Sequence, residues 1–190
     1  MEVEQNIYNN TYNITSNPTI TTDENNFLAA TNDSDCSNSI RSMLNQTGCC
    51  ILGPGDFYIK SGIELPENSM IRGQGNKTRV IWNTPNPAEN SYMFKLQDLC
   101  SLSDMQILGS TQKERNNMLN YIGNNKLIGN LTGILIQGAY GEKTTDTEGN
   151  EITDTTQGPS FCTLSNLFVK CIPGCGLKMV RTGMKVYAHT

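Results

Sequence analysis

One six-residue pattern occurs twice in this chain. Residues 102–107 are Leu-Ser-Asp-Met-Gln-Ile, and residues 164–169 are Leu-Ser-Asn-Leu-Phe-Val, 62 positions later. Each copy is followed by a glycine-led apolar run, at 133–136 and at 176–179, after insertions of different length. A sandwich of hairpins does not require such a recurrence, whereas a coil with fixed strands and free corners produces it. The pattern therefore favours stacked turns of one repeating unit.

Turn residues divide the chain from 49 to 180 into short runs that are rich in apolar and β-branched residues. Each run is bounded by Gly, Pro, Asn or Asp, which is typical of strands joined by tight corners. The predicted strands are 49–52, 56–59, 62–65, 69–73, 78–82, 92–96, 101–109, 132–138, 161–171 and 176–180.

One segment, residues 33–48, has the period of a helix. Asp35 or Ser37 is the expected N-cap and Gly48 the expected stop. The apolar positions follow the i, i+3, i+4 spacing of one helix face, at Ile40, Met43 and Leu44. We predict a short helix at about 35–46.

Only 36% of the chain is hydrophobic, so a thick layered core is not expected. One turn of about 20 residues costs on the order of 1 to 2 kcal/mol per residue in backbone entropy. It brings inward only a few apolar side chains, each worth about 1.5 to 3 kcal/mol. A single turn is therefore unstable, and the turns must stack around a shared narrow core whose open end needs a cover. The predicted helix is suited to be that cover.

The net charge of −4 argues against nucleic acid or an anionic membrane surface as the main partner. Residues 1–22 lack the basic and apolar regions of an export signal, and no run is long enough to span a membrane. We therefore expect a soluble protein without its own export signal.

Seven cysteines do not indicate a disulfide framework, because the number is odd and Cys49 and Cys50 are adjacent. We interpret most of them as buried thiols. Cys171 and Cys175 lack zinc-knuckle spacing and the single histidine is His189, so no metal site is predicted from them.

The pair Gly73 and Gly75 raises the question of a phosphate-binding loop. Such a loop opens a helix and continues as G-x-G-x-x-G or G-x-x-x-x-G-K-[ST]. Here the segment Thr-Arg-Val-Ile-Trp at 78–82 follows, which is a strand pattern. We therefore expect corner glycines at positive φ.

The run from Cys36 to Trp82 resembles the start of a right-handed parallel β-helix of the pectate-lyase-like superfamily. The resemblance is carried by a capping helix, then G-x-x-I-L-G-P-G-x-F-Y-I, then I-x-L-P-x-N-S-x-I-x-G-x-G-x-x-T, and extends over about 35–182. It implies an all-β solenoid at 32–190 behind an extended polar arm at 1–31. Because the last predicted strand has no polar cap after it, we expect a piece of a longer polypeptide.

In that superfamily the pattern opens many bacteriophage tail spikes and many polysaccharide-degrading enzymes. The resemblance implies a tail spike or tail fibre protein of the virion, in which residues 1–31 contact other tail proteins and a homotrimeric β-helix recognises surface polysaccharide. The alternative is a secreted polysaccharide lyase or glycoside hydrolase, located outside the cell. A surface adhesin without activity is a third possibility.

Two insertions, 109–131 and 138–160, are longer than ordinary corners and are candidate binding loops. The second predicts a β-hairpin with its turn at 148–150. It carries five carboxylates, Glu142, Asp146, Glu148, Glu151 and Asp154. These suggest calcium as an alternative, but the EF-hand ligand order is absent and a solvated hairpin is favoured, so no cofactor is predicted.

The catalytic residues stay unknown. Enzymes of this superfamily use carboxylates aligned over successive turns, whereas the matching positions Asp104 and Asn166 present one acid and one amide. Asp98 with Asp104, or Arg72 with Arg79, are interpreted as ordinary corner and surface residues. Enzymatic activity is therefore left open.

Aromatic side chains offer candidate sugar-stacking positions. The candidates are Tyr92, Tyr121, Tyr140 and Trp82, with Phe94 beside them. Aromatic residues on strands more often pack in a core, and the sequence does not decide between core packing and sugar stacking.

Overall fold

The structure is a computed structural model that describes residues 27–30, 34–84, 87–109, 130–138, 143–153, 158–159, 161–180 and 187–189. The elements are β1 (Phe27–Leu28), α1 (Ser37–Thr47), β2 (Cys49–Leu52), β3 (Gly55–Ile59), β4 (Ile63–Leu65), β5 (Met70–Arg72), the 3₁₀ turn η1 (Gly75–Lys77), β6 (Thr78–Trp82), β7 (Ser91–Leu96), β8 (Ser101–Leu108), β9 (Leu131–Gln137), β10 (Lys143–Thr145), β11 (Glu151–Thr153), β12 (Thr163–Lys170), β13 (Cys175–Val180) and β14 (Tyr187–His189). Each of the ten predicted strands overlaps a strand of the structure.

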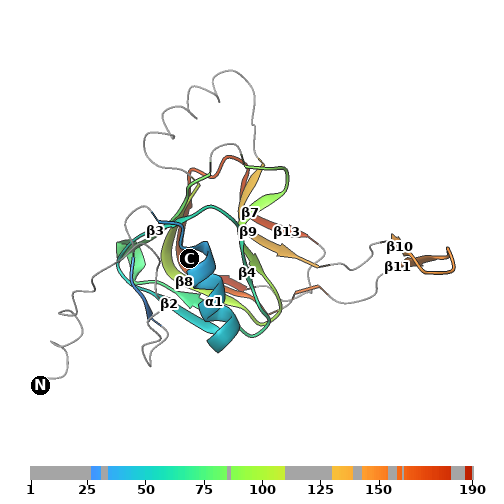
Figure 1. Cartoon of the computed structure of the whole chain (residues 1–190), viewed down its shortest axis with the longest axis horizontal. Coiled ribbons are helices and arrows are strands. Elements are labelled where there is room, and N and C mark those ends of the chain that lie inside the picture. Colours follow the sequence, from blue (N-terminus) through green and yellow to red (C-terminus); the bar gives the residue numbers. More distant parts are fainter. Residues whose placement is uncertain are drawn as a thin grey trace, which may run out of the picture.

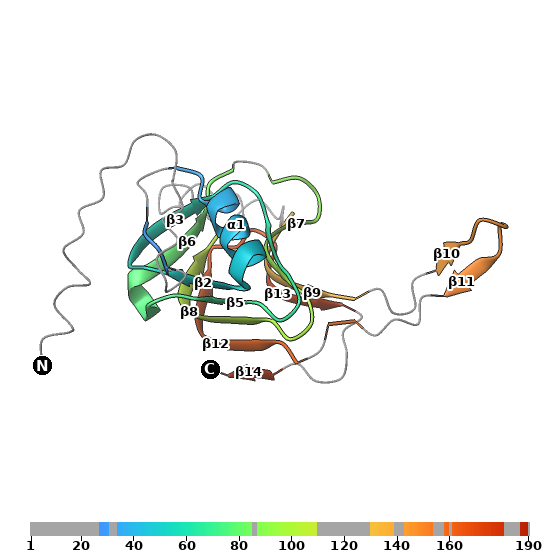
Figure 2. The same ribbon diagram turned by 60° about the horizontal axis from the view of Figure 1, so that its bottom comes forward.

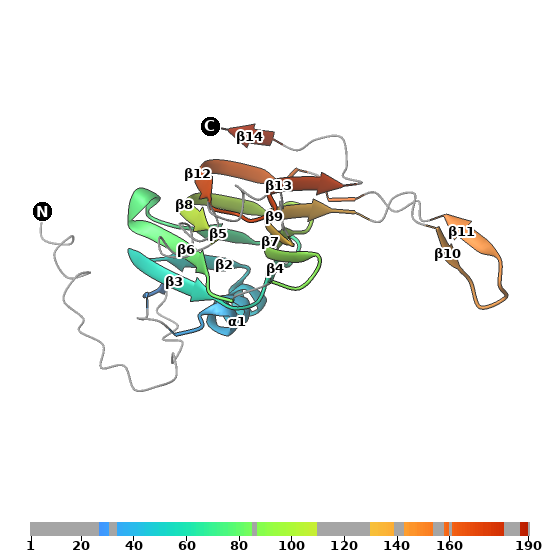
Figure 3. The ribbon, with the colours of Figure 1, turned by 90° about the horizontal axis from the view of Figure 1, so that it is seen from above.

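The strands form two parallel sheets and one separate hairpin. The four-stranded sheet has the order β4-β7-β9-β13, and the eight-stranded sheet contains the path β1-β2-β5-β8-β12-β14 together with β3 and β6. Apart from the β10–β11 hairpin, all strand pairs of the described residues are parallel. The chain visits the four-stranded sheet and then the eight-stranded sheet in successive passes (Figure 3). The all-β prediction is confirmed.

Strand β8 bends between two ladders, and β12 follows it in parallel register. The first part of β8 pairs with β5 and its last part with β6, and the bend lies at Asp104, which has a φ of 57°. Asn166 has a φ of 50° at the matching position of β12. Asp and Asn tolerate this left-handed conformation better than other residues with a side chain, which explains their use at the corner.

The two copies of the sequence repeat pair in parallel and in register. Leu164 is aligned with Leu102, and Ser165 with Ser103. The glycine-led runs also align, with Leu177 beside Ile134. The predicted correspondence of the two copies is confirmed.

A narrow apolar core lies between the two sheets. On the four-stranded sheet its side chains form rows across the strands, such as Ile63, Phe94 and Ile134, none of which is more than 1% exposed. Helix α1 covers one end of this core with Ile40, Met43 and Leu44 (Figure 2). The capping position predicted for the helix is confirmed.

The ends of α1 differ slightly from the prediction of 35–46. The N-cap is Cys36, which makes no side-chain capping bond, and Asp35 instead accepts hydrogen bonds from the backbone and hydroxyl of Ser37 at 3.0 and 2.5 Å. Asp35 also accepts from the backbone of Lys60, so it joins the helix to the end of β3. Gly48 ends the helix at a φ of 69°, as predicted.

The two glycines at 73 and 75 have different roles. Gly75 has a φ of 64° and begins η1, in agreement with the corner prediction. For Gly73 the prediction of positive φ is wrong. This glycine is required by close packing, because a Cβ there would lie 2.4 Å from the backbone oxygen of Asp104.

Parts of three predicted segments lie outside the described residues. Of the predicted arm, 1–26 and 31 lie outside them, whereas Phe27 and Leu28 form β1 and pair with β2. Of the two insertions, 110–129, 139–142, 154–157 and 160 lie outside them. The predicted hairpin is confirmed as β10–β11, which projects from the body in Figure 1.

Candidate ligand-binding groove

An open groove of about 1090 Å³ lies over the outer face of the four-stranded sheet. Strands β7, β9 and β13 provide its floor, and the corners that lead to the eight-stranded sheet provide one side. The floor contains Tyr92, Lys95, Gln97, Thr132, Leu135 and Lys178. Because the floor is built by in-register strands, these side chains are held at fixed spacings of about 4.8 Å per strand.

Side chains that alternate between the inner and outer faces of the sheet explain which residues form most of the floor. Lys95 lies between Phe94 and Leu96, which point inward and are fully buried. The parallel register then aligns Lys95 with Leu135 and with Lys178 on the outer face. The groove therefore has two cationic positions separated by one apolar position.

The two lysines differ in their electrostatic surroundings. Lys95 forms an ion pair of 3.0 Å with Glu64, whose same oxygen accepts a hydrogen bond from Gln97. For Lys178, no ion pair is found within the described part of the chain. Among the described residues, the lysine on the β4–β7 side is thus ion-paired and the lysine on β13 is not.

Two carboxylates, Glu67 and Asp98, lie at the corner side of the groove. They come from successive passes, and the passes are joined there by a hydrogen bond of 3.0 Å from the backbone of Asn68 to the carbonyl of Asp98. Glu67 is not among the residues predicted for a site, although its place directly before a turn is a signal for a corner residue.

Of the predicted aromatic positions, Tyr92 lines the groove. It also lines a second hollow of about 530 Å³, which lies beside α1 and includes Arg41 and Asn45. Trp82 does not line the groove, because it is 5% exposed, belongs to the core and donates its indole N–H to the carbonyl of Thr84. Phe94 is likewise buried. Tyr121 and Tyr140 lie outside the described residues.

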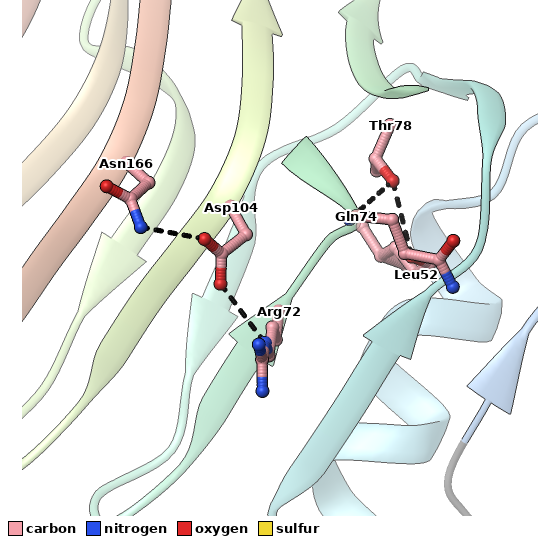
Figure 4. Close-up of polar contacts among 6 residues, drawn as sticks. All are labelled: Leu52, Arg72, Gln74, Thr78, Asp104 and Asn166. Carbon is pink, nitrogen blue, oxygen red and sulfur yellow. Dashed lines mark hydrogen bonds and ion pairs between the residues drawn. The ribbon is translucent and has the colours of Figure 1, made fainter. Parts of the chain in front are cut away.

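Asp104 and Asn166 form a ladder on the outer surface of the eight-stranded sheet, away from the groove lining (Figure 4). Asn166 donates to Asp104 at 2.9 Å, and Arg72 contacts the other carboxylate oxygen at 3.1 Å. The hydrogen bond from Asn166 has the largest effect, and with Ser103 and Arg72 it lowers the pKa of Asp104 below its ordinary value. A carboxylate held ionised by these bonds is poorly suited to be a general acid.

The other predicted pairings are also structural. Arg79 forms a two-pronged ion pair with Asp56, with one contact of 2.7 Å, on the neighbouring strand. Asp98 and Asp104 lie at different corners, one before β8 and the other within it. Neither pair forms a candidate catalytic set.

The described residues contain no group of three or more potential metal ligands. In the hairpin, Asp146 accepts from the backbones of Glu148 and Asn150 at 2.9 and 2.8 Å, and Glu151 pairs with Lys143. These carboxylates are engaged by the hairpin itself. The calcium alternative for the whole set stays a hypothesis, since Glu142 and Asp154 lie outside the described residues.

All seven cysteines are free thiols, and four of them, Cys36, Cys50, Cys100 and Cys162, are buried. Burial raises the pKa of Cys50 to about 12 and that of Cys162 to about 11. Such thiols are unreactive. Cys175 is exposed, so the buried interpretation does not apply to it.

The chain matches no protein-family model, no curated protein and no solved structure. Within the described residues, no helix has the length and apolar character needed to cross a membrane.

Proposed function

We propose that the chain forms the capped end of a right-handed parallel β-helix that binds surface polysaccharide in the groove over β7, β9 and β13. The β-helix interpretation is supported by the parallel register of both sheets and by the two bends at Asp104 and Asn166. In this interpretation each coil contributes one strand to the four-stranded sheet. To the eight-stranded sheet it contributes either two strands, as β2 with β3 and β5 with β6, or one bent strand, as β8 and β12.

The observation that carries the binding proposal is the groove itself, with Tyr92 beside a floor of amide, ammonium and hydroxyl groups. A sugar ring has an apolar C–H face and a rim of hydroxyl groups. The first fits an aromatic ring, and the second fits fixed polar groups such as Gln97 and Thr132. Lys178 adds a position for an acidic sugar or another anionic substituent.

We propose further that the protein is a bacteriophage tail spike or tail fibre. Residues 1–31 would attach it to other tail proteins, and a homotrimer would present the groove to the host surface. The alternative is a secreted polysaccharide lyase or glycoside hydrolase. Binding is favoured over cleavage because the only carboxylates among the described groove residues, Glu67 and Asp98, both lie at the corner side, whereas cleavage of a glycosidic bond needs two carboxyl groups that flank it.

The test is binding of the purified chain to a panel of bacterial capsular and lipopolysaccharide glycans. Tyr92→Ala should weaken binding about three- to tenfold, because an aromatic contact of this kind is worth about 0.5 to 1.5 kcal/mol. Tyr58→Ala is the matched control, since Tyr58 is half-buried on β3 and does not line the groove. Equal binding by both variants and the wild type would contradict the groove assignment.

The enzyme alternative is tested on the same glycans by product analysis. Release of unsaturated or reducing ends, lost in Asp98→Asn or Glu67→Gln, would favour the lyase or hydrolase. Binding without product formation would favour the attachment protein.

A further inference from the structure

Three residues with positive φ occupy one column at the corner between the two sheets. They are Asn68, Leu99 and Phe161, with φ values of 61°, 56° and 54°. Each stands two positions before an aligned residue of the eight-stranded sheet, namely Met70, Ser101 and Thr163. The parallel register therefore stacks the three corners directly on each other.

Two of these residues are unsuited to the conformation they adopt. Asn is tolerated in the left-handed region because its short polar side chain bonds locally, whereas Leu and Phe are disfavoured there by steric crowding. An observed backbone outlier of this kind persists only where the surroundings impose it, and such outliers gather at functional sites.

Leu99 and Phe161 are only about half buried in this conformation. Leu99 is 47% exposed and Phe161 is 49% exposed, although each is followed by a cysteine that is fully buried. The corner thus presents an aliphatic and an aromatic side chain to solvent, in adjacent positions where Asn would fit the backbone better.

The column borders the groove already described. Asp98 precedes Leu99 and lines the groove, and Pro159 lines it two positions before Phe161. The thiol of Cys162 donates to the carbonyl of Gln97 at 3.2 Å, which ties the corner of Phe161 to a residue of the groove floor. Leu99 and Phe161 therefore belong to the corner that forms one side of the groove, next in the chain to its lining residues.

We propose that Leu99 and Phe161 form an apolar platform on which a further sugar ring of the bound polysaccharide stacks, so that the glycan continues from the groove around the corner. This inference rests on the proposed function. The exposed Asn68 side chain and the corner carboxylate Asp98 supply polar partners for the hydroxyl rim of that ring.

The size of the platform favours a sugar over a protein partner. Two half-exposed side chains present on the order of 200 Å², whereas a stable protein interface buries about 800 Å² per partner. One pyranose ring is of the size that two such side chains cover, and continuity with the groove places it on the path of a polymer.

The test uses Phe161→Asn and Leu99→Asn in the full chain. Asn suits the left-handed backbone, so both variants should fold with an unchanged or raised melting temperature. We expect each to bind a long oligosaccharide about three- to tenfold more weakly, and to bind short oligosaccharides that occupy only the groove as well as the wild type. Phe161→Tyr, which keeps the ring, should retain affinity for the long ligand.

The outcomes separate the platform from the proposed function. If Tyr92→Ala weakens glycan binding and both Asn variants bind long ligands normally, the platform is refuted and the groove stands. If the wild type binds no glycan of the panel, both proposals fail. A lower melting temperature in both Asn variants assigns the two residues to the fold, and a change in sedimentation coefficient assigns them to contact between copies; either result overturns the platform.

Discussion

At the scale of single residues, the corner ladder of Arg72, Asp104 and Asn166 shows how side chains fix the register of parallel strands. Each member comes from a different pass, so the ladder bonds can form only when the strands are aligned. Because the lowered pKa of Asp104 reflects its partners in the folded state, the contribution to stability is present above the ordinary carboxyl pKa of about 3.9 and is lost as pH falls through the lowered value.

Asn166→Asp should reverse this contribution at neutral pH. Two adjacent carboxylates would repel each other, which we expect to cost about 0.5 to 1 kcal/mol at an exposed site. The melting temperature should therefore be lower than that of the wild type at pH 7, and the difference should shrink near pH 4 as one carboxyl becomes protonated. Thermal unfolding at both pH values measures this. A deficit that is the same at both would contradict the electrostatic role of the ladder.

Residue type alone does not predict which side chains line the groove. Tyr92, Phe94 and Trp82 are all aromatic residues on strands, yet only Tyr92 lines the groove. Alternation fails near Tyr92 because Met93 and Phe94 are consecutive and both fully buried, so the strand changes its orientation there. A two-residue alternation pattern in the sequence cannot predict such a change of orientation. It likewise cannot predict the positive φ of Leu99 and Phe161.

At the scale of elements, most strands are predictable from the sequence, whereas their ends and the strands β1 and β14 are not. Runs such as 78–82 and 92–96 alternate or cluster apolar residues between turn residues, and both correspond to strands. The two-residue strand β1 carries no comparable signal, because its pairing depends on β2, which is distant in sequence. Long-range pairing therefore determines what local patterns leave open.

Corners are the elements whose substitution should be most informative. Gly73→Ala should destabilise the fold by about 1 to 3 kcal/mol, because its Cβ would lie 2.4 Å from the backbone oxygen of Asp104. Gly75→Asn is the matched control, since a Cβ there meets nothing within 4 Å and Asn accepts the φ of 64°. Chemical denaturation measures both. A larger loss for Gly75→Asn than for Gly73→Ala would contradict the packing role of Gly73.

At the scale of the whole molecule, the two ends of the core differ. Helix α1 covers one end, whereas Leu177 and Met179 of β13 are 39% and 45% exposed. Their aligned neighbours on β9, Ile134 and Ile136, are buried. Leu177 and Met179 therefore continue the apolar rows of the core, but no element of the described residues covers them as α1 covers the other end. Figure 3 shows β12, β13 and β14 on the side of the body opposite α1.

The glycan and platform proposals both depend on the in-register stacking of successive passes, and a designed disulfide tests it most directly. Aligned residues of neighbouring parallel strands lie about 4.8 Å apart, which a disulfide can bridge. In a background without Cys171 and Cys175, Ser103→Cys with Ser165→Cys should therefore oxidise to an intramolecular disulfide, detected by mass spectrometry. Ser101→Cys with Ser165→Cys, displaced by two residues and so about 8 Å apart, should stay reduced. Efficient oxidation of the displaced pair and none of the aligned pair would contradict the account.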